Sequence, residues 1–105
     1  MMLVLHSWKV RPLDKAQVDR MMEIWGKIEG ELAERTDIER KCWYTTLDGK
    51  RGLNVLEISD PESAGAYLLE LNVALGEFLE AEICQVADLD TAVGAIANGL
   101  ARIPG

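Results

Sequence analysis

The hydrophobic pattern of this chain switches repeatedly between a period of about two residues and a period of about 3.6 residues. A period of two is typical of strands, and a period of 3.6 is typical of amphipathic helices. In chain order, the switches predict strand, helix, strand, strand, helix, strand and a final helix. Because 105 residues provide one modest core, these elements are expected to form a single domain, residues 1–105.

Four segments carry the alternation of a strand: Met2 to Val10, Ile38 to Thr46, Gly52 to Ile58 and Phe78 to Val86. The first has apolar residues on both faces, which predicts a central strand that is covered on both sides. Between the second and third segments, Asp48 and Gly49 predict a two-residue hairpin turn, because both residue types tolerate a positive φ. That turn predicts the pairings Arg40 with Glu57, Cys42 with Val55, Trp43 with Asn54 and Tyr44 with Leu53. A bulge would shift this register.

The first helix is expected directly after the first strand. Asp14 is a suitable N-cap, and Gln17 three residues later completes the pattern of a capping box. Apolar residues then recur at helical spacing: Val18, Met21, Met22, Trp25, Ile28 and Leu32. Gly26 and Gly30 weaken this helix, so a bend or an early end is expected there.

Two further helices follow the third and fourth strands. Asp60 and Pro61 supply a cap and a first-turn proline for the second helix, and Gly76 ends it. Either Asp88 or Asp90 caps the final helix. Its apolar stripe is formed by Val93, Ile96, Ala97, Leu100 and Ile103.

This order of elements predicts an α+β fold, the ferredoxin-like β-α-β-β-α-β sandwich with a four-stranded antiparallel sheet and a C-terminal helix. Two helices can cover only one face of such a sheet, so the second face needs another cover. The final helix either covers that face of its own sheet or reaches across to a partner.

The chain carries a net charge of −7, from 18 acidic and 11 basic residues. Phosphate backbones and anionic membrane surfaces both select for Lys and Arg, so neither a nucleic acid nor a membrane is an expected partner.

The start of the chain has no basic segment and no small-residue cleavage site. No apolar run approaches the roughly 20 residues of a membrane-spanning helix. A cytoplasmic location is therefore expected.

Four stretches carry a resemblance that covers most of the chain. They are the opening apolar strand ending in Trp8, the Cys42-Trp43-Tyr44 strand before the Asp48-Gly49 turn, Leu53 to Asp60 with its exit LEISDPES, and EFLEAEICQVADLDTAV from Glu77 to Val93. On these strings the chain resembles the dimeric α/β-barrel superfamily, in particular its small bacterial proteins of unknown function.

The resemblance implies a homodimer in which two sheets pack their uncovered faces into a barrel-like interior. Relatives in the superfamily use that interior, or a cleft beside it, to bind small hydrophobic molecules. Some are cofactor-free monooxygenases, some are isomerases and some bind haem. No residue motif of this chain selects one of these activities, and no cofactor is expected.

His6 is the only histidine, and its ordinary pKa lies near neutrality. Beside Val4 and Trp8, it is expected either to line the barrel interior as an acid, a base or a haem ligand, or to form a hydrogen bond at the dimer interface. No carboxylate or thiol partner for it is visible in the sequence, so a catalytic role has no further support.

Four more residues are candidates for contact with a ligand. Trp8, Trp43 and Tyr44 either stack on a flat molecule, oriented by a hydroxyl or indole N–H, or pack in the core of the dimer. Asn54 is polar in a predicted central strand, so it either points into a wet pocket or pairs with a neighbouring side chain.

Acidic residues and cysteines point to no metal site. Glu80 and Glu82 share one face of the fourth strand, where charges that protect an edge strand are favoured over a metal or acid–base pair. Cys42 and Cys84 have no CxxC spacing and no nearby histidine, so both are expected to be small buried hydrophobes.

Two functions remain open. The favoured one is a homodimeric module that binds a small hydrophobic ligand or another partner without chemistry, because no paired catalytic constellation is present. The alternative is an enzyme of the cofactor-free monooxygenase or isomerase kind, with His6, Trp43 and Tyr44 around its substrate.

Overall fold

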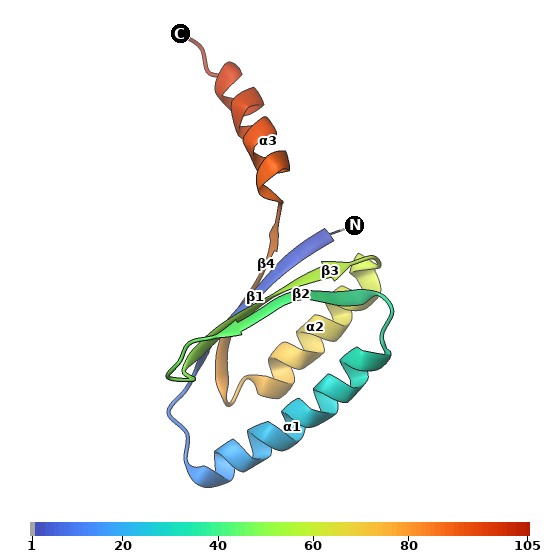
Figure 1. Cartoon of the computed structure of the whole chain (residues 1–105), viewed down its shortest axis with the longest axis vertical. Helices are drawn as coiled ribbons and strands as arrows, with labels where there is room; N and C mark the ends of the chain where they lie inside the picture. Colours follow the sequence, from blue (N-terminus) through green and yellow to red (C-terminus); the bar gives the residue numbers. More distant parts are fainter. Residues whose placement is uncertain (1) are drawn as a thin grey trace.

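The computed structural model describes residues 2–105 and contains the predicted elements in the predicted order (Figure 1). The four strands are β1 (Met2–Val10), β2 (Ile38–Thr45), β3 (Arg51–Ile58) and β4 (Leu79–Val86). The three helices are α1 (Lys15–Glu34), α2 (Pro61–Leu75) and α3 (Leu89–Ala101). Each end of a strand lies within one residue of the end predicted from the alternation.

The strands form one four-stranded sheet in the order β2-β3-β1-β4. All three neighbouring pairs are antiparallel. This confirms the α+β class and the antiparallel sheet, and the arrangement is consistent with a ferredoxin-like fold. β1 is central, as its two apolar faces predict, and β4 lies at an edge.

The hairpin between β2 and β3 contains a bulge. Three predicted pairings are confirmed: Cys42 with Val55, Trp43 with Asn54 and Tyr44 with Leu53. The pairing of Arg40 with Glu57 is wrong, because the register shifts between Arg40 and Cys42 and places Arg40 opposite Leu56. The extra residue turns the side chains of Arg40 and Trp43 to the same face of the sheet, although three positions separate them.

The expected local signals are present at the turn and at the helix starts. Gly49 has a φ of 72° in the hairpin, but the predicted two-residue turn is wrong, because Asp48 has no positive φ and residues 46–50 connect β2 to β3. The carboxylate of Asp14 accepts from the backbone N–H of Gln17, and the Gln17 side chain accepts from the Asp14 N–H, which confirms the capping box. Asp60 caps α2, and Asp88 rather than Asp90 caps α3.

α1 runs through both of its glycines to Glu34, so the expected early end is wrong. Each glycine weakens a helix by up to about 1 kcal/mol relative to alanine. Side chains on both sides of the glycines offset this cost by packing against the sheet, among them Trp25, Ile28 and Leu32.

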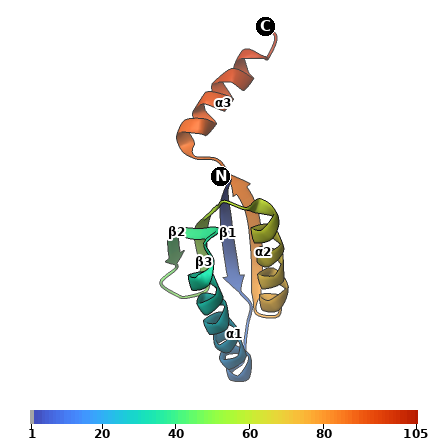
Figure 2. The same cartoon turned by 90° about the vertical axis from the view of Figure 1, so that its right-hand side faces the viewer.

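α1 and α2 cover one face of the sheet (Figures 1 and 2). Two apolar clusters fill the space between the layers. One consists of Val4, Ile38, Leu56, Ile58, Ala64, Tyr67 and Leu68, and the other of Trp8, Ile28, Leu75, Phe78 and Leu79. We call this side of the sheet the helix-covered face.

The second face of the sheet is left uncovered by the helices of its own chain, and we call it the open face. Its centre is apolar and is formed by Leu5, Tyr44, Leu53, Val55 and Cys84, which the strand register brings together. Tyr44 is 67% exposed and Leu53 is 37% exposed. α3 does not cover this face, because it continues beyond the end of β4 and away from the sheet (Figures 1 and 2).

Candidate functional site

Three tryptophans form an aromatic ladder between α1 and the helix-covered face. Trp25 of α1 stacks on Trp43 of β2 with ring centroids 6.1 Å apart and planes 12° apart. Trp25 also contacts Trp8 of β1 edge-on, with ring centroids 5.8 Å apart. These are all three tryptophans of the chain, so its indole fluorescence arises entirely from this cluster.

Trp8 can occupy its place because it is paired across the strands with Gly52. A Cβ atom at position 52 would overlap the six-membered ring of the Trp8 indole. The absence of a side chain in β3 therefore provides the space for the buried tryptophan in β1.

A polar cluster lies further along the same layer, beside the ladder. Arg40 donates two hydrogen bonds to the carboxylate of Glu29 on α1, at 2.8 and 3.1 Å. The Arg40 guanidinium also lies 4.0 Å above the ring centroid of Trp43. The forked ion pair joins β2 to α1 at the edge of the cluster, and the cation–π contact within β2 holds the guanidinium over Trp43.

His6 and Asn54 face each other across the neighbouring strands β1 and β3. The Asn54 amide and Nδ1 of His6 are 3.4 Å apart, with the amide N–H donating to the ring. Burial lowers the pKa of His6, and the charge of Arg40 lowers that pKa further. The imidazole is therefore neutral near pH 7 and keeps its remaining N–H on Nε2.

Two buried polar atoms of the cluster have no hydrogen-bond partner within residues 2–105. They are Oδ1 of Asn54 and Nε of Arg40, an acceptor and a donor. Asn54 is only 5% exposed, so bulk water does not satisfy its carbonyl oxygen. An unpaired buried polar atom costs about 1–3 kcal/mol, which a molecule with a matching donor and acceptor would recover.

Two spaces meet at this cluster. A cavity of about 40 Å³ lies between the sheet and the helices and is lined by His6, Asn54 and Arg40. A cleft of about 460 Å³ opens between α1 and the β2–β3 hairpin and is lined by the tryptophan ladder. Trp25 and Glu29 line both spaces, so they form the boundary between the outer cleft and the inner polar cavity.

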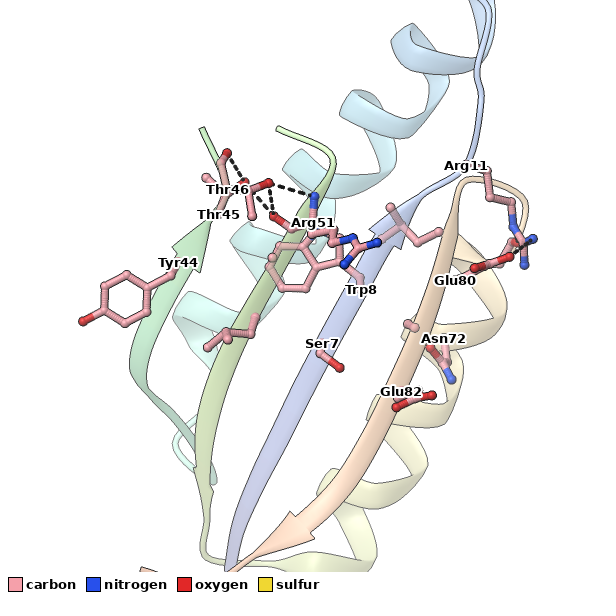
Figure 3. A pocket seen from close by; sticks show the side chains of 15 residues that line it. Ser7, Trp8, Arg11, Tyr44, Thr45, Thr46, Arg51, Asn72, Glu80 and Glu82 are labelled. Atoms are coloured by element: carbon pink, nitrogen blue, oxygen red, sulfur yellow. Dashed lines mark hydrogen bonds and ion pairs between the residues drawn. The ribbon is translucent and has the colours of Figure 1, made fainter. Parts of the chain in front are cut away.

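A wider hollow of about 810 Å³ lies at the hairpin end of the sheet and extends over the open face. Tyr44 lies at one side of this hollow and Glu82 at the other, with Ser7 between them (Figure 3). The Arg11 guanidinium pairs with Glu80 at its rim at 3.2 Å. Its breadth and its exposed polar residues distinguish it from the enclosed, mostly apolar pockets that hold small molecules.

Four of the five residues predicted to contact a ligand lie together: His6, Trp8, Trp43 and Asn54. They lie on the helix-covered face, so the position at the uncovered face expected for His6, Trp8 and Trp43 is wrong; only Tyr44 lies there. The physical reason is that β1 is apolar on both faces, so its pattern does not show which face the helices cover. Asn54 pairs with His6, which was one of its two expected situations. Contact with a ligand stays a prediction for all five.

Arg40 and Glu29 are not predicted from the sequence as part of a site, and Trp25 is predicted only as part of the apolar stripe of its helix. The bulge hides Arg40, because an unbroken alternation assigns it to the opposite face and to Glu57. Glu29 lies on the polar side of the helical pattern, where no signal marks its partner. One sequence signal could have found this cluster. Trp25 lies at the centre of the apolar stripe of α1, and two strands of the sheet also carry a tryptophan.

The other candidate groups are separate. Cys42 is half-buried and Cys84 is exposed, so the expected burial of Cys84 is wrong: its side chain points to the open face of the edge strand. No group of three or more His, Cys, Asp or Glu side chains in residues 2–105 could hold a metal ion. Within the same range, no helix is long and apolar enough to cross a membrane.

The fold and the site together define an α+β domain with one open sheet face, a tryptophan-lined cleft, and beside the cleft a small cavity lined by the two residues that carry unpaired polar atoms. The sequence matches no protein-family model and no curated protein.

Proposed function

We propose that this protein is a homodimeric module that binds a small, flat and largely apolar ligand in the cleft between α1 and the sheet. The observation that carries the proposal is the tryptophan-lined cleft, which shares Trp25 and Glu29 with a cavity lined by two residues with unpaired buried polar atoms. Stacked indoles favour a flat apolar body, and the unpaired atoms favour one polar group at its end.

The volumes of the outer cleft and the inner cavity fit a flat apolar ligand body and a single polar group, respectively. The outer cleft of about 460 Å³ falls within the usual range of about 300–1,000 Å³ for small-molecule sites. The inner cavity of about 40 Å³ has room for a hydroxyl, a carbonyl or a water molecule, but not for a ring. The ligand body would therefore lie against Trp43 and Trp25 while its polar group reaches Asn54 and Arg40.

The homodimer is supported by the open face. Monomeric proteins rarely leave the centre of a sheet apolar and uncovered. A second copy presents the same surface, and a two-fold interface buries both at once. Such a dimer agrees with the dimeric α/β barrel that the sequence resembles.

Calorimetric titration of 2-naphthol, a flat aromatic molecule with one hydroxyl group, tests the ligand site. We expect Trp43→Ala and Asn54→Leu each to weaken binding by about tenfold or more, which corresponds to about 1.4 kcal/mol. Tyr44→Ala is the matched control, because Tyr44 is the next residue of β2 and points to the open face. Absence of 2-naphthol binding, or a loss caused by Tyr44→Ala alone, contradicts the proposed site.

The alternative function, a cofactor-free monooxygenase-like or isomerase-like enzyme, is favoured by one specific observation. His6 is neutral and lines the same cavity as Arg40, so it has the form that accepts a proton, beside a charge that stabilises an anion. Exchange of the α-protons of 1-indanone in deuterated water tests this. Turnover that His6→Gln abolishes without changing affinity supports the enzyme, and an exchange rate equal to that of buffer excludes this reaction.

A further inference from the structure

α3 carries a second uncovered apolar surface. Its stripe consists of Leu89, Val93, Ile96, Leu100 and Ile103, whose exposed fractions lie between 56 and 76%. No residue of α3 is buried, and residues 91–101 contain no charged side chain. An apolar helix of this kind is stable in water only when another surface covers its stripe.

The connection from β4 keeps α3 away from its own sheet. Two residues separate Val86 from Leu89, and the carboxylate of Asp88 accepts from the N–H of Thr91 at 2.9 Å and from its hydroxyl at 3.0 Å. This cap fixes the start of the helix, which continues past the end of β4 (Figures 1 and 2). The stripe and the open face of one chain therefore do not meet.

We propose that α3 of each chain lies across the open face of a second copy, so that two chains exchange their final helices. This inference rests on the homodimer in the proposed function, but in it each open face packs against the partner's α3 rather than against the partner's open face. One copy offers one stripe and one open face, so a single two-fold axis satisfies both surfaces of both chains and the assembly closes.

Length supports the exchange. The 13 residues of α3 span about 20 Å, and the eight residues of an open-face strand such as β3 or β4 span about 27 Å. A two-fold axis beside the β4–α3 connections brings each helix over the partner's sheet from the end where β4 finishes. Val93 then lies level with Cys84, because both are about 6–7 Å from that end.

The charges of α3 favour a protein partner over a lipid surface. A lipid surface fits less well, because an interfacial helix normally carries several Lys or Arg residues, whereas α3 begins with Asp88 and Asp90.

Disulfide trapping tests the contact. In a Cys42→Ser background we introduce Val93→Cys, leave Cys84 in place and oxidise with copper phenanthroline. We expect a covalent dimer of twice 11.6 kDa on a non-reducing gel. Asn98→Cys, on the opposite side of α3, is the matched control and should give at least tenfold less covalent dimer than Val93→Cys. Equal cross-linking of both variants, or a disulfide within one chain, overturns the proposal.

Molar mass in solution separates this inference from the homodimer itself. The double variant Ile96→Asp and Leu100→Asp should weaken dimerisation by more than 100-fold, whereas Asn98→Asp should not; the body still folds because α3 contributes no buried residue. A double variant that remains a dimer overturns the exchange and leaves a dimer made by direct sheet packing. A wild-type monomer at micromolar concentration overturns both, and its co-flotation with phosphatidylcholine vesicles would assign the stripe to lipid.

Discussion

The contact between Trp8 and Gly52 predicts that Gly52→Ala destabilises the protein. A Cβ atom at this position would overlap the Trp8 indole, which is 8% exposed and packed against Trp25. Overpacking of this kind costs typically 1–3 kcal/mol, because the ring or the strand has to move. An entropy of unfolding of about 2.1 cal/mol/K per residue gives about 0.22 kcal/mol/K for 105 residues. A loss of about 2 kcal/mol therefore lowers Tm by about 9 °C.

The assay is urea unfolding of four proteins: wild type, Gly52→Ala, Trp8→Leu and the double variant. In the Trp8→Leu background the overlapping ring is gone, so Gly52→Ala should cost nothing, or gain up to about 1 kcal/mol as alanine replaces glycine in a strand. Gly65→Ala is the control, because a Cβ at this helical position meets no atom within 4 Å. An equal cost of Gly52→Ala in both backgrounds refutes the argument, since the loss would then not come from the indole.

Two further predictions concern the polar cluster. Glu29→Ala leaves the Arg40 guanidinium, whose side chain is 26% exposed, without its carboxylate, and should cost about 1–2 kcal/mol in urea unfolding. The lowered pKa of His6 means that below pH 6.5 the unfolded chain binds the proton more readily than the folded chain. Stability is therefore complete above pH 6.5 and falls as the pH drops toward the lowered pKa. His6→Gln should remove this part of the slope, and an unchanged slope between pH 7 and 5 would contradict it.

Local chemistry explains how much of the fold is predictable from the sequence. The capping box of Asp14 and Gln17, the Asp60-Pro61 helix start and the Asp48-Gly49 turn each involve residues close in sequence. Their geometry depends on neighbours that the sequence shows directly, so both helix starts and the position of the hairpin at Gly49 are confirmed. The four-stranded antiparallel sheet follows from the order of the elements that these signals separate.

The site is less predictable because it depends on contacts between distant residues. The bulge between Arg40 and Cys42 adds one residue without disturbing the pattern, yet it decides which face Arg40 shares with Trp43. The apolar alternation of β1 fits either face, so His6 was expected at the uncovered one. The space that Gly52 provides for Trp8 becomes visible only when the two strands are paired.

The proposed ligand cleft and the proposed dimer interface lie on different sides of the sheet. The free energy of ligand binding is therefore expected to be independent of the free energy of dimerisation. The cleft is built from α1, β1 and the β2–β3 hairpin of one chain, and no residue of α3 lines it. Loss of the dimer should therefore leave ligand binding intact. We expect the affinity for 2-naphthol to change by less than about twofold in the Ile96→Asp and Leu100→Asp variant, measured by calorimetry at equal chain concentration. A larger change would mean that the open face sets the position of the tryptophans through β1 and β3, whose side chains alternate between the two faces. In that case the dimer would be part of the ligand site.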